Sequence, residues 1–132
     1  MFLVEKYISF GDCDPAGVIF FSRVFDIAHT VYEKFLFDNN LGDYFANREV
    51  LIPLVHAEAD YKKPLRTGDI VNAVVRLAEL KECSFKLSYS IFDKSGKVAV
   101  TIKTVHTTVT KAEFKKCPVP EDLKTALLKI RD

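Results

Sequence analysis

Hydrophobic and polar positions follow two different periods along this chain. Residues 2–10 alternate, which predicts a strand interrupted by Lys6, with one face formed by Phe2, Val4, Ile8 and Phe10. Beyond Ser22, a suitable N-cap, apolar residues recur every three or four positions and predict a long helix with a wide apolar stripe: Val24, Phe25, Ile27, Ala28, Val31, Tyr32, Phe35 and Leu36. Asn39, Asn40 and Gly42 then end this helix.

The period changes to two from Ile52 onward and predicts four strands, over residues 55–63, 70–80, 84–92 and 97–110. The segment "PLRTGD" separates the first two strands, and "DKSG" predicts a hairpin turn between the last two. Residues 120–130 predict a short final helix, because they begin with Pro120 and with acids in the first turn. The order of strand, long helix and four antiparallel strands indicates the α+β class, in which a curved sheet buries the stripe of the helix.

The composition is that of a soluble globular protein. Of 132 residues, 48% are hydrophobic and 28% charged, so we expect one folded domain over residues 1–132. The net charge of +1 gives no overall field that would attract nucleic acid or an anionic membrane. The opening "MFLVEKYISF" lacks the apolar core of a signal peptide, and no apolar run reaches the roughly 20 residues of a membrane span. We therefore expect a cytoplasmic protein.

The three cysteines do not predict a bound metal or a disulfide framework. Cys13, Cys83 and Cys117 are odd in number and too widely spaced for either. Cys13 precedes a helix, whose N-terminus stabilises a thiolate, but the aspartates on both sides of it oppose ionisation.

The segment "FGDCDPAG", residues 10–17, has the clearest chemical signal. Asp12 and Asp14 flank a cysteine, before a Pro-Ala-Gly turn that leads into the long helix. These carboxylates can simply cap the turn, since Asp is a favoured turn residue. They can begin a metal site, although no further carboxylate or histidine lies at ligand spacing. One of them can instead act as a general base or nucleophile where water is partly excluded.

The same segment resembles, nearly letter for letter, the active-site loop of 4-hydroxybenzoyl-CoA thioesterases, and the resemblance extends over about residues 2–109. "AGVIFFSRVFDIAHTVYEKFL" and "IPLVHAEADYKKPLRTGD" are similar to segments of 1,4-dihydroxy-2-naphthoyl-CoA thioesterases, which act in menaquinone and phylloquinone synthesis. The resemblance implies a hotdog fold and hydrolysis of an aryl-CoA thioester without a cofactor. Short- or medium-chain acyl-CoA or acyl-carrier-protein thioesters, and a non-catalytic module that binds acyl groups, remain the alternatives.

The resemblance also implies roles for residues in and after the loop. It assigns catalysis to Asp14, as general base or as nucleophile, and not to Asp12. The backbone amide of Phe21 would donate to the oxyanion at the positive end of the helix. Gly17 would let the backbone turn sharply and approach the acyl group.

The remaining candidates would bind the two halves of the substrate. The acyl half is assigned to His56, Tyr61, Phe20 and Phe25, and the phosphates of coenzyme A to Lys62, Lys63, Arg66 and Lys81. Where the benzoyl enzyme has a run of basic residues, this chain has "LKECSF" and keeps only Lys81, so phosphate contacts can come from another subunit. His29 is interpreted as a core or interface residue and His106 as structural.

We expect a homo-oligomer, either a dimer or a tetramer assembled from two dimers. Hotdog relatives join two sheets and place each active site between subunits, which here would bring Asp14 against the partner's residues 56–61. The long strand at 97–110 is expected to be an edge of the sheet, where unpaired backbone groups favour association.

Overall fold

The structure, a computed structural model, describes residues 1–131. Its elements in chain order are β1 (Phe2–Tyr7), η1 (Phe10–Asp12), α1 (Arg23–Asp38), η2 (Gly42–Phe45), β2 (Val50–Leu51), β3 (Leu54–Tyr61), β4 (Ile70–Leu80), β5 (Ser84–Phe92), β6 (Val98–Thr107), β7 (Val109–Thr110) and α2 (Glu121–Leu128). No helix within residues 1–131 is long and apolar enough to cross a membrane.

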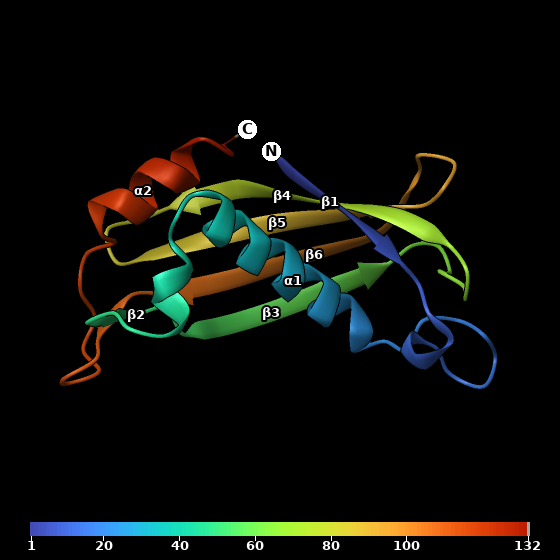
Figure 1. Cartoon of the computed structure of the whole chain (residues 1–132), viewed down its shortest axis with the longest axis horizontal. Helices are drawn as coiled ribbons and strands as arrows, with labels where there is room; N and C mark the ends of the chain where they lie inside the picture. The colour runs from blue at the N-terminus through green and yellow to red at the C-terminus, as the bar shows by residue number, and fades with distance from the viewer. Residues whose placement is uncertain (132) are drawn as a thin grey trace.

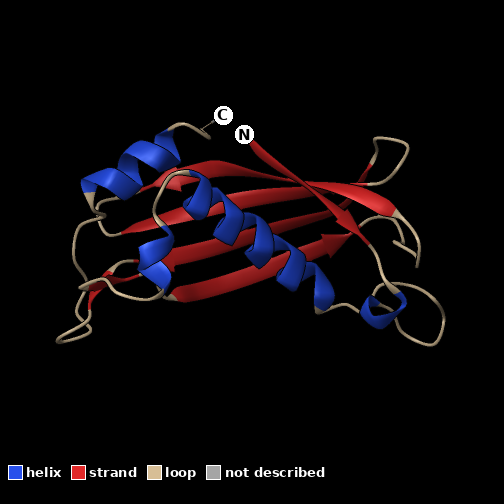
Figure 2. Cartoon of the chain, in the orientation of Figure 1, coloured by secondary structure: helices blue, strands red, loops and turns tan. Residues whose placement is uncertain are grey.

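Helix α1 lies across one face of the large sheet, as Figures 1 and 2 show. The predicted stripe is the buried face of this helix, although Phe25 is only partly buried. On the sheet, the predicted inward faces of β4 and β5 are also buried: Val71, Ala73, Val75, Leu77, Phe85, Leu87, Tyr89 and Ile91. The α+β class is therefore confirmed, and the core lies between α1 and the sheet.

The strand order differs from the sequence prediction. The five-stranded antiparallel sheet has the order β1-β4-β5-β6-β3, so β6 lies inside the sheet between β5 and β3. The expectation that the strand at 97–110 forms an edge is wrong. The edges are β1 and β3, and all but one of the side chains of β3 are exposed. Alternation along β6 could not reveal this, because it reports which face a side chain occupies and not which strand lies alongside.

Two element ends also differ from the sequence prediction. The first strand ends at Tyr7, and the chain then turns through η1, which leaves the ring of Phe10 exposed rather than on the buried face. The last predicted strand is divided, since β6 ends at Thr107 and β7 pairs with β2 in a separate two-stranded sheet. The predicted "DKSG" turn joins β5 to β6 as expected, with Asp93 Oδ1 accepting from the Ser95 and Lys97 amides.

Both ends of the chain lie along the same side of β4. Phe2 pairs with Val75, and two residues further on the amide of Leu77 donates to the carbonyl of Ile130 at 2.9 Å. Arg131 forms a bridge with the same Leu77. The last described residues thus continue the edge that β1 begins.

Candidate active site

The loop between β1 and α1 is held by the segment that enters β4. Ile8 donates its amide to the carbonyl of Asp69 and Ile19 donates to that of Leu65, both at 2.8 Å. Val18 bridges to Arg66, and Cys13 bridges back to Ile19 within the loop. These contacts fix both ends of the "FGDCDPAG" segment, so its two carboxylates have defined and different surroundings.

Asp12 is committed to holding the loop together. Its Oδ2 accepts hydrogen bonds from the amide and the hydroxyl of Ser9, both at 3.0 Å, and Lys6 Nζ lies 3.6 Å away. Burial opposes the ionisation of this carboxyl, but the Ser9 hydrogen bonds and the charges of Lys6 and Arg23 outweigh it and lower the pKa of Asp12. A structural role for Asp12 agrees with the assignment of catalysis to the other aspartate.

Asp14 is half-buried and only one of its carboxylate oxygens is used by the turn. Oδ1 accepts from the amides of Ala16 at 2.9 Å and Val18 at 3.4 Å, which is the turn-capping interpretation of this residue. Oδ2 accepts no hydrogen bond from residues 1–131. Gly17 has a φ of +78°, a conformation that a side chain would disfavour, and it lets the chain double back so that the Asp14 amide reaches the Val18 carbonyl. Capping and chemistry are therefore compatible, because the turn presents the second oxygen.

The backbone just before α1 contains an amide without a partner in the described part of the chain. Ser22 occupies the N-cap position as predicted, but its side chain makes no capping hydrogen bond. The Phe21 amide donates to no other residue in the described part of the chain, whereas the carbonyl of Phe21 accepts from the hydroxyl of Tyr61. Unpaired amides at a helix N-terminus suit a developing negative charge. Tyr61 was expected to contact substrate, and in this chain it holds the backbone that carries this amide.

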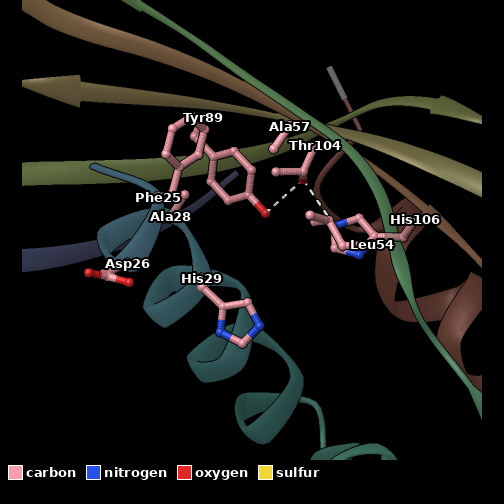
Figure 3. Close-up of a pocket in the computed structure, with 9 residues that line it drawn as sticks. All are labelled: Phe25, Asp26, Ala28, His29, Leu54, Ala57, Tyr89, Thr104 and His106. Atoms are coloured by element: carbon pink, nitrogen blue, oxygen red, sulfur yellow. Dashed lines mark hydrogen bonds between the residues drawn. The ribbon is translucent and has the colours of Figure 1, made fainter. Parts of the chain in front are cut away.

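Two hollows border this end of α1. One, of about 220 Å³, lies beside the loop between Val18 and Ile19 on one side and Tyr61, Lys62 and Lys63 on the other. The second, of about 260 Å³, lies between the first two turns of α1 and the sheet. Its helix side includes Phe25, Ala28 and His29, and its sheet side includes Tyr89, Thr104 and His106 (Figure 3).

The sheet side of the second hollow holds polar atoms in a mostly apolar setting. Thr104 Oγ1 lies 3.2 Å from Tyr89 Oη and 2.9 Å from His106 Nε2. The ring of His106 is stacked between those of Tyr32 and Phe85, at centroid distances of 4.7 and 4.9 Å. Burial, and to a lesser extent His29, lower the pKa of His106 to about 4, while burial raises the pKa of Tyr89 above its usual range. Tyr89, Thr104 and His106 thus form a hydrogen-bonded row that carries no charge at neutral pH.

The chain is similar to known proteins in both sequence and fold. The profile of the thioesterase-like superfamily matches residues 8–127. A 1,4-dihydroxy-2-naphthoyl-CoA hydrolase of Microcystis aeruginosa is 34% identical over 122 residues, covering 91% of this chain and 88% of the relative. One of Synechococcus elongatus is 32% identical over 123 residues, covering 91% and 90%. The chain belongs to the thioesterase-like superfamily.

A solved member of this superfamily confirms the hotdog fold. The crystal structure of a 1,4-dihydroxy-2-naphthoyl-CoA thioesterase from Synechocystis superposes with a TM-score of 0.91 at 26% identity, covering 98% of this chain and 96% of that one. The family expected from the "FGDCDPAG" loop is thereby confirmed as well.

The structure brings together only part of the predicted thioesterase site. Eight of the predicted residues lie close together in the fold. Those on the loop between β1 and α1 are Asp14, Gly17, Phe20 and Phe21, and those on the end of β3 and the segment after it are Tyr61, Lys62, Lys63 and Arg66. Lys81 does not lie with them, because it follows the far end of β4, where its Nζ lies 3.6 Å from a Glu79 carboxylate oxygen. His56 lies on the outer face of β3 and pairs with Glu58 at 3.2 Å, so within one chain it does not reach Asp14.

Sequence reasoning assigned Phe25 of the second hollow to the acyl group but missed the polar residues on its sheet side. His29 is exposed beside it rather than in the core, which corrects that part of its interpretation. His106 is buried as a structural residue would be, yet it also lines the hollow together with Tyr89 and Thr104. The signal was present in the alternation of β5 and β6, which places these residues on the face toward α1. Alternation could not give the register between β5 and β6, which brings Tyr89 next to Thr104 and His106.

Proposed function

We propose that this protein hydrolyses an aryl-CoA thioester and that 1,4-dihydroxy-2-naphthoyl-CoA is its substrate. The observation that carries the proposal is that one oxygen of the Asp14 carboxylate and the amide of Phe21 are both unpaired among residues 1–131, on the segment that leads to a mostly apolar cavity along α1. The names of the relatives from Microcystis, Synechococcus and Synechocystis support the choice of acyl group. That substrate would give the protein a role in menaquinone or phylloquinone synthesis.

Asp14 can drive hydrolysis in two ways, and both balance. As a general base it takes a proton from water, the water oxygen bonds to the acyl carbon, and the carbon–sulfur bond breaks. As a nucleophile it forms a mixed anhydride, which water then cleaves. Either route consumes one water and releases the free acid and the thiol of coenzyme A. In both, the amide of Phe21 would donate to the oxygen that becomes negative, a contribution typically worth about 10²- to 10³-fold.

The first hollow suits the coenzyme A half of the substrate. Lys62 and Lys63 line it beside the catalytic loop, and the exposed Arg66 lies two residues beyond its Pro64 wall. Lysine and arginine heads at such a rim can pair with phosphates. Lys81, at the other end of the sheet, would have to act on the substrate of another subunit.

The active unit is proposed to be a homodimer joined through β3, alone or as half of a tetramer. This strand is an open edge that exposes Leu54 and Val55 by 49% and 59%, and such an edge invites pairing with a second copy. The edge is not the strand we expected, but it contains residues 56–61, the segment expected to meet the partner's loop. The cytoplasmic location and the single domain inferred from the sequence stay predictions.

A panel of thioesters tests the reaction. The acid products and free thiol are measured with 1,4-dihydroxy-2-naphthoyl-CoA, 4-hydroxybenzoyl-CoA, acetyl-CoA, hexanoyl-CoA and an acyl-carrier-protein thioester. We expect the highest kcat/KM with the dihydroxynaphthoyl substrate. A clear preference for the alkyl thioesters would overturn the aryl assignment, and no thiol release from any of them would favour a binding module.

A mixing experiment tests the shared site. Chains inactivated by Asp14→Asn are combined with chains inactivated by His56→Ala, and sedimentation confirms that hybrids form. If each site uses both chains, one of the two sites in each hybrid is intact and activity returns. Full activity in a demonstrated monomer would contradict the shared site.

A further inference from the structure

The cavity along α1 has one polar wall, and three residues from two neighbouring strands form it. Tyr89 on β5 and Thr104 and His106 on β6 follow one another through hydrogen bonds of 3.2 and 2.9 Å centred on the Thr104 hydroxyl. Figure 3 shows the Tyr89 hydroxyl at the end of this row, pointing into the space between the sheet and α1. All three side chains are buried.

The hydrogen atoms in this row do not satisfy all of its polar atoms. If Thr104 donates to Tyr89, it must accept from His106 Nε2, which leaves the Tyr89 proton unused and His106 Nδ1 a bare acceptor. If Tyr89 donates to Thr104, the directions reverse, and the unused groups are a Tyr89 lone pair and an Nδ1 proton. Nδ1 has no partner among residues 1–131, so neither arrangement is fixed by a hydrogen bond at this nitrogen. In either case Tyr89 keeps hydrogen-bonding capacity at the cavity.

The row can therefore present a donor or an acceptor. Because His106 is neutral at neutral pH, it can exchange one tautomer for the other, and the hydroxyls of Thr104 and Tyr89 then reverse with it. A ligand oxygen that accepts and one that donates would both find a partner at Tyr89. A hydrocarbon would leave that partner unmet in a low-dielectric cavity, which is unfavourable.

The cavity is in the right place for the acyl group of the proposed reaction. Its first helix residue, Phe25, lies four residues after Phe21 in the chain, and His29 lies about one helical turn beyond Phe25. An acyl carbonyl at the Phe21 amide would thus place its ring between α1 and the row. This step rests on the proposed function.

We propose that Tyr89 is a specificity-determining residue that hydrogen-bonds an oxygen substituent on the ring of the acyl group, with Thr104 and His106 as positioning residues for its hydroxyl. The site then selects oxygenated aryl thioesters over aryl thioesters without ring oxygen. It does so without charge, which distinguishes it from a site built on a carboxylate.

The test compares matched substrates. The kcat/KM ratio is measured for 1,4-dihydroxy-2-naphthoyl-CoA against 2-naphthoyl-CoA, and for 4-hydroxybenzoyl-CoA against benzoyl-CoA. Ring oxygens also alter the intrinsic reactivity of a thioester, so the decisive quantity is how much a substitution changes this ratio. Tyr89→Phe should lower it by at least about fivefold, with kcat/KM for the unsubstituted thioesters nearly unchanged.

Variants on β6 separate positioning from packing. Thr104→Val removes the hydroxyl at constant shape and should lower the ratio in the same direction, while Thr104→Ser should retain it. Thr101→Val makes the same change on the outer face of the same strand and should leave the ratio as it is. Thermal unfolding confirms that each variant is folded, and Thr104→Val decides the matter should Tyr89→Phe fail to fold.

The results distinguish this proposal from the one on which it rests. If both members of each aryl pair are hydrolysed and the ratio survives both Tyr89→Phe and Thr104→Val, the specificity role is overturned while the aryl thioesterase stands. If no aryl thioester is hydrolysed by the parent protein while alkyl thioesters are, both proposals fall.

Discussion

The two ends of helix α1 are built on opposite principles. Beyond its C-terminal end, polar groups of η2 and α2 satisfy one another: Tyr44 donates to Asp122 Oδ1 at 2.8 Å, and Arg48 bonds both Asp122 and Asp43. The Arg48 guanidinium also lies 3.9 Å from the centre of the Tyr44 ring. We refer to Asp43, Tyr44, Arg48 and Asp122 as the clamp, because they tie η2 to α2.

At the N-terminal end, some groups are left unpaired. The Phe21 amide has no acceptor in residues 1–131, Asp14 keeps one oxygen free, and the rings of Phe20 and Phe21 are largely exposed. The clamp groups hydrogen-bond one another and stabilise the fold, whereas the unpaired groups at the N-terminal end remain available to a substrate. Substitutions at the two ends should therefore fail in different assays.

The largest effect is expected at the N-terminal end. Asp14→Asn keeps the size of the side chain but removes the base or nucleophile, so kcat with the best thioester should fall by about 10²-fold or more, with the thermal unfolding midpoint nearly unchanged. Turnover is measured by thiol release.

Asp12→Asn is the matched control two residues away. It weakens the hydrogen bonds to Ser9 and the attraction to Lys6, so it should lower stability and reduce turnover far less than Asp14→Asn does. An Asp14→Asn enzyme within about tenfold of the parent would show that this end of the helix does not supply the chemistry.

His106 lies between the two ends and gives a pH-dependent effect. Because its pKa falls from 6.5 in the unfolded chain to about 4 in the fold, the unfolded chain binds more protons between these values. The stability linked to neutral His106 is complete above about pH 6.5 and is lost as the pH falls toward 4. From pH 7 to 5 the free energy of unfolding should decrease by about 2 kcal/mol from this residue.

Urea unfolding at pH 7 and 5, at constant protein concentration, measures this decrease. His106→Gln should reduce it, because the group whose pKa differs between the folded and unfolded chain is then absent. Equal pH dependence in the parent and in His106→Gln would place the titrating group elsewhere.

A smaller effect is expected at the clamp. Tyr44→Phe removes the hydrogen bond to Asp122 and should cost about 1 to 2 kcal/mol in the free energy of unfolding, because the acceptor is charged. Turnover at a temperature where both proteins are folded should be unchanged. A loss of kcat as large as the loss of stability would show that the clamp and the catalytic end are coupled.

The smallest effect concerns the rim of the first hollow. Replacing Lys62 and Lys63 together with glutamine should raise KM for acyl-CoA a few-fold and leave kcat intact, since exposed charge pairs are each worth about 1 kcal/mol or less. The same acyl group on pantetheine, which lacks the nucleotide phosphates, should show no change. Lys86→Gln with Lys103→Gln, on the outer face, is the control pair.

The sequence predicted the parts of the molecule that depend on neighbours along the chain. The strand at 84–92 and the stripe of α1 were found because each has an uninterrupted period, and the loop at Asp14 because a resemblance of eight consecutive residues carried it. What failed depends on contacts between distant segments. β3 joins β6 across a long stretch of sequence, so the true edge could not be read from alternation.

The site shows the same limit. Lys81 was grouped with Lys62 although the eleven residues of β4 separate it from the catalytic end, a span of about 35 Å. Tyr89 was found on the correct face, but the contact with Thr104 that it shares with His106 depends on the register between β5 and β6. The sequence also could not show that one oxygen of Asp14 caps the turn while the other is left available for catalysis, because this depends on the geometry of the turn.

Residues near the two ends of the chain, Phe2 and Ile130, both lie along the same side of β4, so the backbone is close to forming a closed circle. Phe2 and Ile130 contact residues of β4 that are two apart, so a short linker between the ends would close the backbone with little rearrangement. Closure removes conformations from the unfolded chain and so favours the fold. The turn at Asp93–Gly96 would then be a suitable place to open the chain and create a circular permutant. In this permutant the order of strands in the sheet is preserved, and the new termini lie at the ends of β5 and β6.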